Sequence, residues 1–270
     1  AMKCDFHMHS SFSGDSDTPM QAMIERAITL GLDTICFTEH YDEDYPKGEE
    51  DFSLAVSDYY ETLCTLKKQY CSKINICFGV ELGMQSHLGS LYTKYVQSWP
   101  FDFVIASQHR LDHTDPYYPA YWKNKNPSDV IRHYFKETLQ NLKSMQGEYD
   151  TLAHLDYIVR YAGSGFTSYH YNEYADVIDP ILSYLIEQGK CLEVNTAGFK
   201  YGLGHPNPCE EVLKRYRQLG GEKITIGSDG HRPKHIAYDF GRLQDLLKHI
   251  GFQYYCIFQK RNPEFRRLDK

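Results

Sequence analysis

The chain has 270 residues, of which 41% are hydrophobic and 24% are charged, as in a soluble globular protein. This length fits one α/β domain, so we expect a single domain over residues 1–270. The net charge of −7 argues against a nucleic-acid-binding surface, and no apolar run reaches the roughly 20 residues that cross a bilayer.

The N-terminal part of the chain contains a β-rich run, Lys3–His7, followed by an amphipathic helical pattern. We expect Thr18 to be the N-cap of this helix, with Pro19 at its first position and Gln21 completing a capping box. Gly31 should end the helix, because glycine readily adopts the left-handed conformation that follows one. The apolar stripe of the helix comprises Met20, Met23, Ile24, Ala27 and Leu30.

Six further β-rich runs alternate with helical patterns along the rest of the chain. Their largely apolar character suits parallel strands that are covered on both faces. The expected strands are Thr34–Thr38, Ile74–Glu81, Phe101–Ser107, Thr151–His154, Cys191–Asn195 and Lys223–Gly227. The expected helices lie near residues 55–72, 127–146, 173–188, 208–219 and 239–250.

Seven strand–helix units imply parallel βαβ connections, and hence an α/β fold. We predict a distorted seven-stranded (β/α)7 TIM-like barrel, one unit short of the usual eightfold barrel. A doubly wound open sheet is the main alternative. Two long connections, the acidic Tyr41–Asp51 and the aromatic Asp112–Pro127, are expected to shape a substrate pocket.

Histidines and carboxylates end or follow almost every predicted strand. In a parallel barrel these strand ends open onto one face, where active sites form. A lone histidine or a single HxH motif is a weak signal, but the combination along seven consecutive strands indicates a metal site. The strand-end residues are His7, His9, Glu39, His40, Glu81, His109, His154, Glu193, Asn195, Asp229 and His231.

The spacing inside these motifs fits metal coordination. In the HxH motif, the imidazoles of His7 and His9 point to the same side of an extended chain and can hold one ion together. Asp229 and His231 are also two residues apart, and the intervening glycine allows a bend toward neighbouring ions. In a site otherwise rich in neutral imidazole, Glu81 and Asp229 are the natural carboxylates to bridge two ions.

Cysteine usage indicates a reducing compartment. None of the eight cysteines forms a CxxC pair, and Cys36, Cys77 and Cys191 lie inside apolar runs. We therefore expect buried, reduced thiols in a cytoplasmic protein.

These motifs together resemble the polymerase and histidinol phosphatase (PHP) family, and within it most closely the histidinol-phosphate phosphatases. The resemblance covers nearly the whole chain in order, and the set is specific although each motif alone is weak. The matching segments are Asp5–Ser10, Phe37–His40, Gly79–Glu81, Ser107–His109, Ala153–Arg160, Leu192–Gly198 and Gly227–His231.

The resemblance implies a metal-dependent phosphomonoesterase with two or three divalent ions, usually zinc, manganese or iron. Its expected substrate is L-histidinol phosphate, and no nucleic acid or membrane partner is expected. Alternatives are a PHP-family phosphodiesterase or nuclease acting on small nucleotides, and a non-catalytic metal-binding module. The implied ligand groups are His7, His9, Glu81 and Asp229; Glu81, His109 and His154; and Asp15, His40 and His231.

Asp17 lies close enough to Asp15 to compete for the third ligand group. Glu81 and Asp229 are also the expected catalytic carboxylates, beside a hydroxide that bridges the first two metal ions. Buried acids such as Glu39 and Asp5 are expected to orient the ligand histidines.

The phosphate-binding residues are less strongly marked in the sequence. Arg160 is the best candidate, as a catalytic and substrate-binding residue, because a guanidinium matches two phosphate oxygens. Asn195 belongs to a family-like motif and is a second expected substrate contact. Lys200 stands near the place where relatives tend to have arginine, and it could contact phosphate as a point charge.

Overall fold

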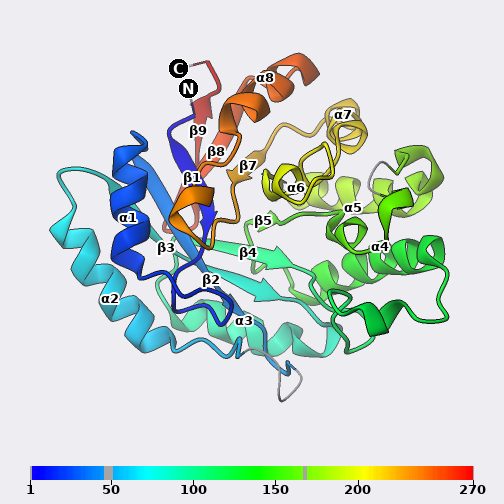
Figure 1. Ribbon diagram of the computed structural model, residues 1–270, viewed down its shortest axis with the longest axis horizontal. Coiled ribbons are helices and arrows are strands. Elements are labelled where there is room, and N and C mark those ends of the chain that lie inside the picture. Colours follow the sequence, from blue (N-terminus) through cyan, green and yellow to red (C-terminus); the bar gives the residue numbers. More distant parts are fainter. Residues whose placement is uncertain (1, 46–50, 167–168, 270) are drawn as a thin grey trace.

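The computed structural model describes residues 2–45, 51–166 and 169–269, and its centre is a parallel sheet rolled into a barrel (Figure 1). The seven strands pair in chain order, and Met8 and Gly230 form a parallel bridge that nearly closes the barrel between the last strand and the first. This closure confirms the seven-stranded barrel and excludes the open sheet. The strands are β1 (Cys4–Met8), β2 (Thr34–Tyr41), β3 (Asn75–Gly83), β4 (Phe103–Ser107), β5 (Thr151–Leu152), β6 (Cys191–Asn195) and β7 (Ile224–Gly227).

The barrel strands are buried along almost their entire length, as their apolar sequences predict. Three of them run further than predicted, β1 to Met8, β2 to Tyr41 and β3 to Gly83. His40 therefore lies within regular strand. In contrast, β5 has only two residues, because His154 adopts a left-handed backbone conformation (φ 28°) that interrupts the extended chain. The prediction that this strand continues to His154 is therefore wrong.

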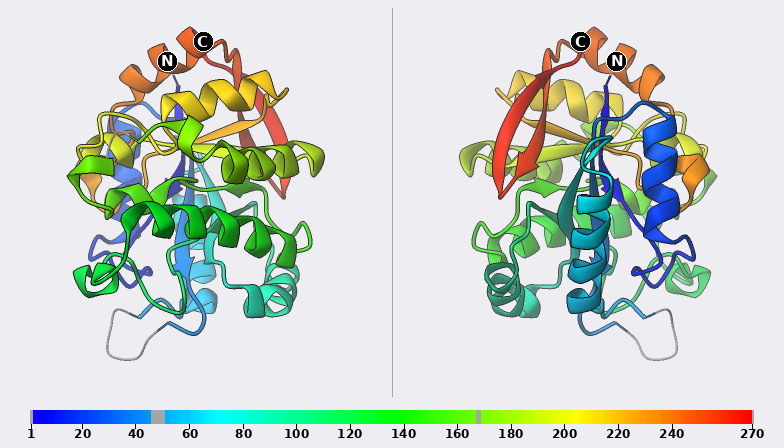
Figure 2. Two further views of the ribbon diagram at one scale, coloured as in Figure 1. Left: turned by 90° about the vertical axis from the view of Figure 1, so that its right-hand side faces the viewer. Right: turned by 90° about the vertical axis from the view of Figure 1, so that its left-hand side faces the viewer.

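Helices connect the strands and lie around the outside of the barrel (Figures 1 and 2). No helix within the described ranges is long and apolar enough to span a membrane. The α-helices are α1 (Met20–Thr29), α2 (Val56–Gln69), α3 (Gly89–Ser98), α4 (Pro127–Ser144), α5 (Ala175–Glu187), α6 (Ala197–Lys200), α7 (Glu210–Gln218) and α8 (Phe240–Ile250). Short 3-10 helices are η1 (Ser86–Leu88), η2 (Pro119–Trp122), η3 (Tyr157–Arg160), η4 (Ser164–Phe166), η5 (Tyr171–Glu173) and η6 (Pro233–His235).

The start of α1 differs from the predicted capping box. Pro19 is the N-cap residue, and its side chain has no polar atom that could cap the helix. The hydroxyl of Thr18 does not cap it either, and donates instead to the carbonyl of His231 (3.2 Å). Thr18 therefore joins the start of α1 to the segment after β7. The predicted apolar stripe is buried except for Leu30, which follows the last helical turn and is 39% exposed.

A C-terminal hairpin, β8 (Tyr254–Gln259) and β9 (Asn262–Arg267), was not predicted (red in Figure 2). Arg266 of the hairpin donates to Asp33, just before β2 (2.6 Å), and the amide of Arg261 donates to the carbonyl of Asp102, just before β4 (2.9 Å). The hairpin thus packs against the amino-terminal ends of the strands, and the carboxyl-terminal ends remain available for the strand-end residues.

Candidate metal centre

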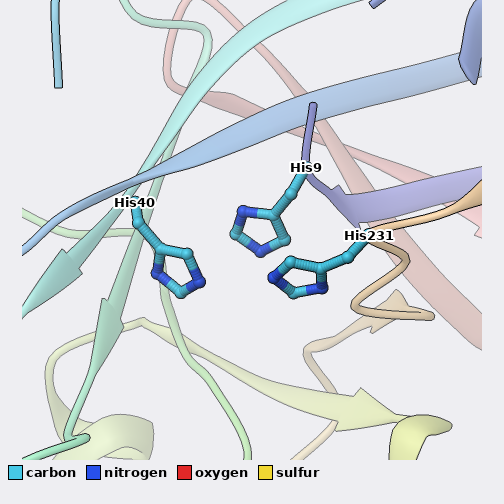
Figure 3. Close-up of side chains that lie close together, drawn as sticks. All are labelled: His9, His40 and His231. Atoms are coloured by element: carbon cyan, nitrogen blue, oxygen red, sulfur yellow. The ribbon is translucent and has the colours of Figure 1, made fainter. Parts of the chain in front are cut away.

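The carboxyl-terminal ends of the barrel strands bring the predicted ligand residues together. Figure 3 shows three of them, His9, His40 and His231, with their rings turned toward one another. His40 lies in β2, whereas His9 and His231 follow β1 and β7, the two strands that meet where the barrel closes. Residues far apart in sequence therefore share one rim of the barrel.

The first predicted group is buried and converges on two carboxylate oxygens. Nε2 of His7 lies 2.8 Å from Oε1 of Glu81, and Nε2 of His9 lies 3.2 Å from the same atom. Both imidazole nitrogens also lie 3.2 Å from Oδ1 of Asp229. Four side chains therefore direct ligand atoms at one point, and all of these atoms lie within 4.8 Å of one another.

The second predicted group uses the other oxygen of Glu81. Oε2 of this carboxylate lies 2.9 Å from Nε2 of His109 and 3.3 Å from Nε2 of His154. Because Oε1 faces the first group and Oε2 the second, Glu81 has the geometry of a bridging carboxylate.

The third predicted group lies at the more open side of the rim. Oδ2 of Asp15 is 3.3 Å from Nε2 of His40 and 3.0 Å from Nε2 of His231. The ring of His9 stacks against both histidines, with centroids 4.2 Å from His40 and 4.1 Å from His231. Because Asp15 contacts both histidines, this geometry favours Asp15 over Asp17 as the third-group carboxylate.

The chemistry of the cluster fits divalent metal ions. Imidazole and carboxylate donors suit zinc, manganese and iron. Several buried ligand atoms make no hydrogen bond in spite of these close contacts, namely Nε2 of His9, Oδ1 of Asp229 and Nε2 of His231. Buried polar atoms are normally satisfied, so unpaired ones that converge on a few points are what bound cations would complete.

Further side chains hold the ligand rings in place. The Nδ1 atom of His7 donates to Glu193 (2.5 Å), which leaves its Nε2 facing the first group. His109 makes the corresponding bond to Asp42 (3.2 Å). Such hydrogen bonds orient a ligand ring and select the nitrogen that binds metal. Glu193 was recognised at a strand end but not in this role, and Asp42 was missed altogether.

The two acids predicted to orient histidines act indirectly. Glu39 accepts from the hydroxyl of Ser13 (3.0 Å), and Ser13 in turn pairs with Nδ1 of His9 (3.0 Å). Asp5 instead accepts backbone amides, including that of His7 (3.3 Å), and therefore positions main chain rather than a ring.

Replacing Glu193 with glutamine is expected to weaken Zn²⁺ binding by about 10–100-fold, because the His7 ring loses its charged acceptor. Calorimetric titration with Zn²⁺ measures this change. Glu222→Gln is the matched control, since the side chain of Glu222 is 77% exposed and should leave the affinity unaltered. Equal affinities of the two variants would contradict the orienting role.

The ionisation of the cluster predicts that ion binding releases protons. Burial would raise the pKa of Glu81, but the imidazoles of His7, His40 and His109 hold that pKa well below its usual range. Burial would likewise lower the pKa of His40, but Asp15 and Glu81 outweigh it and raise that pKa to about 9. An ion that binds imidazole must displace this proton, so affinity should weaken as the pH falls below about 9. Calorimetry in buffers of different ionisation enthalpy measures the released protons, and a heat independent of buffer would contradict the prediction.

A cavity opens directly above the cluster and contains Arg160. Its wall includes His109, His154, Asp229 and His231 together with Arg160 and several tyrosines. Nε of Arg160 donates to Asn207 (2.9 Å), whereas its buried Nη2 has no hydrogen-bond partner. The guanidinium is thus held by one nitrogen and can offer another to an anion beside the cluster.

The other two predicted substrate contacts are placed differently. Asn195 is fully buried and donates to Glu193 (2.8 Å) and Asp229 (3.4 Å), while its carbonyl accepts the amide of Ala197 (2.9 Å). Both polar atoms of its side chain are engaged inside the protein, so we revise its predicted role from substrate contact to positioning. Lys200 ends α6 beside the cavity residue Tyr201, and its contact with phosphate stays a prediction.

A parallel barrel with a histidine–carboxylate cluster at its rim and an arginine in the cavity above defines a metal-dependent hydrolase of phosphate esters. The family model described as PHP domain matches residues 5–197. The chain therefore belongs to the PHP family.

Similarity to individual proteins extends over almost the whole chain. The histidinol-phosphatase of Lactococcus lactis subsp. lactis (strain IL1403) is 32% identical over 262 residues, which are 95% of this chain and 94% of that protein. The probable histidinol-phosphatase of Thermotoga maritima is 31% identical over 258 residues, 95% of this chain and 96% of that protein. A crystal structure of the Lactococcus enzyme, complexed with zinc, L-histidinol and phosphate, matches with a TM-score of 0.90 at 31% identity, covering 98% of this chain and 100% of that chain.

Proposed function

We propose that this protein is a histidinol-phosphatase, which hydrolyses L-histidinol phosphate to L-histidinol and phosphate in histidine biosynthesis. The observation that carries the proposal is a single cavity that joins the ligand cluster and Arg160 to a wall of aromatic and acidic side chains. The names of the Lactococcus and Thermotoga relatives, and the L-histidinol and phosphate in the Lactococcus crystal structure, support the same substrate.

We propose that the rim cluster holds two or three divalent ions, with zinc, manganese and iron as the candidates. When bound, such ions neutralise phosphate charge and lower the pKa of water from about 15.7 to ~7. Glu81 and Asp229 lie at the centre of the cluster and would keep the ions close together. The ligands would be His7, His9, Asp15, His40, Glu81, His109, His154, Asp229 and His231.

Arg160 would bind the phosphate group of the substrate. Its guanidinium lies over the rings of Tyr157 and Tyr201, with centroids 5.2 and 4.6 Å away, and its Nε is fixed by Asn207. These contacts hold the planar guanidinium in place before the substrate binds. Little conformational entropy is therefore lost when the guanidinium pairs with two phosphate oxygens.

The aromatic and acidic side chains of the cavity wall suit the other end of L-histidinol phosphate. This end carries an imidazole and an ammonium group, which need aromatic and acidic partners. Asp115 and Tyr45 both line the wall, and the hydroxyl of Tyr45 donates to Asp115 (2.6 Å). Phe52, Tyr117 and Tyr118 supply further aromatic faces for stacking and cation–π contact. Residues 46–50 of the predicted pocket loop Tyr41–Asp51 lie outside the described residues.

The substrate is thus a small phosphorylated molecule, and the net charge of −7 supports the prediction that nucleic acid is not a partner. A cytoplasmic setting stays a prediction. Its support is that all eight cysteines are free thiols, six of them buried.

A phosphate-release assay on metal-analysed protein tests the proposal. L-histidinol phosphate should be turned over faster than a 5′-nucleotide and much faster than a generic phosphodiester such as bis(p-nitrophenyl) phosphate. Treatment with a chelator should abolish turnover, and added Zn²⁺ or Mn²⁺ should restore it. Faster hydrolysis of the diester would overturn the assignment in favour of a phosphodiesterase of the same family.

A further inference from the structure

We propose that Asp44, His87 and His113 form a second, outer metal site, which holds one transition-metal ion such as Zn²⁺. These three residues are separate from the rim cluster, and their ligand atoms all lie within 4.8 Å of one another. Two imidazoles and one carboxylate are a common zinc ligand set, in which water completes the coordination.

The contacts among the three side chains bring their donor atoms into one place. Nε2 of His87 lies 3.0 Å from Oδ2 of Asp44, and the rings of His87 and His113 have centroids 5.4 Å apart. Donor atoms around tetrahedral zinc are roughly 3.3–3.5 Å apart, as its bonds of about 2.0–2.2 Å require. The side chains of His87 and Asp44 are 44% and 61% exposed, so rotation can close the remaining distance and an ion can enter from solvent.

Each of the three residues lies on the segment that follows a rim ligand in sequence. Asp44 follows His40 of β2, His87 follows Glu81 of β3, and His113 follows His109 after β4. Since β2, β3 and β4 are neighbours in the barrel, the segments that leave them emerge side by side.

A buried arginine fixes the backbone at two of the three positions. Nη1 of Arg110 donates to the carbonyl of Asp44, and Nη2 donates to the carbonyl of His113 (2.7 Å). Arg110 is only 6% exposed, so these bonds are shielded from water. One guanidinium thus joins the two loops at the residues that carry the proposed ligands, and the site is largely assembled before an ion binds.

An ion in the outer site would also fix the substrate end of the cavity, a consequence that rests on the proposed function. Tyr45 is next to Asp44 in sequence, and Asp115 lies two residues after His113. These neighbours share a hydrogen bond of 2.6 Å and both line the cavity. Joining Asp44 to His113 through an ion should therefore restrain the pair that faces the leaving group.

Titration of the zinc-loaded enzyme with further Zn²⁺ tests the site. Calorimetry should detect one additional equivalent, with a dissociation constant on the order of micromolar because only three protein ligands contribute. In His87→Ala and His113→Ala this binding should weaken at least tenfold. His170→Ala is the matched control, because His170 is an exposed histidine paired with a single carboxylate, Glu211 (3.6 Å). The control should keep the additional equivalent.

Hydrogen exchange gives a second readout that does not depend on activity. Amides of residues 110–118 should exchange more slowly when Zn²⁺ is added to the wild type. In His87→Ala, added Zn²⁺ should leave the exchange rates of these amides unchanged. The proposal is overturned if His87→Ala binds the additional equivalent as tightly as wild type, or if wild type binds none. Failure to turn over L-histidinol phosphate would overturn the proposed function. The zinc titration would still test the outer metal site, because it does not depend on activity.

Discussion

Replacing Glu81 with glutamine is expected to lower the turnover of L-histidinol phosphate by roughly 10³-fold. One oxygen of this carboxylate faces His7 and His9, and the other faces His109 and His154, so the substitution removes a negative charge shared by two ligand groups. Stabilisation by metal ions contributes several kcal/mol to such reactions, and each 1.36 kcal/mol is tenfold in rate. Steady-state phosphate release, with the metal content of each preparation measured in parallel, checks the prediction.

Glu61→Gln is the matched control for this experiment. Glu61 is an exposed residue of α2, and its substitution should alter neither metal content nor turnover. A Glu81→Gln variant that keeps its full metal content and loses less than tenfold in rate would contradict the bridging role.

Replacing Arg160 with lysine should lower kcat/KM for the same substrate by about 10²-fold or more. Lysine keeps the positive charge but cannot pair with two phosphate oxygens, and loss of one such donor typically costs 10²–10³-fold in rate. The hydrogen bond to Asn207 is also lost, so the cation is held less firmly. Inhibition by inorganic phosphate should weaken in parallel, because the product binds the same arginine.

The control for the second prediction is Arg242→Lys. Arg242 also stacks on an aromatic ring, with its guanidinium 4.0 Å from the centroid of Phe199, but it is exposed and belongs to α8. Its substitution should change kcat/KM little. If Arg160→Lys retains both turnover and phosphate inhibition, Arg160 is a structural residue and another group binds phosphate.

Much of the rim cluster follows from local rules of sequence. The HxH spacing places His7 and His9 on one side of a strand, and the two histidines do converge on the same carboxylates. The rule that parallel strands end on one face then brings Glu81 and His109 beside them. These rules depend only on strand alternation and chain order, both of which are visible in the sequence.

Other parts of the site depend on contacts that no local rule describes. Glu193 orients His7 from a position 186 residues away, and its role could not be read from its own neighbours in sequence. The choice between Asp15 and Asp17 is similar, because both acids lie in one loop and only the folded chain turns Asp15 toward His40. Asn195 likewise looks like a substrate contact in sequence, but burial commits its amide to the protein.

The seven parallel strand–helix units and the histidines and carboxylates at their strand ends were determined by the sequence alone. They follow from apolar periodicity and chain order, which are properties of short segments. The tertiary structure alone decided the closure of the sheet into a barrel, the partners that orient the ligands and the outer cluster of Asp44, His87 and His113. These features depend on distances between side chains that come from different strands, and such distances exist only after the barrel has closed between β7 and β1.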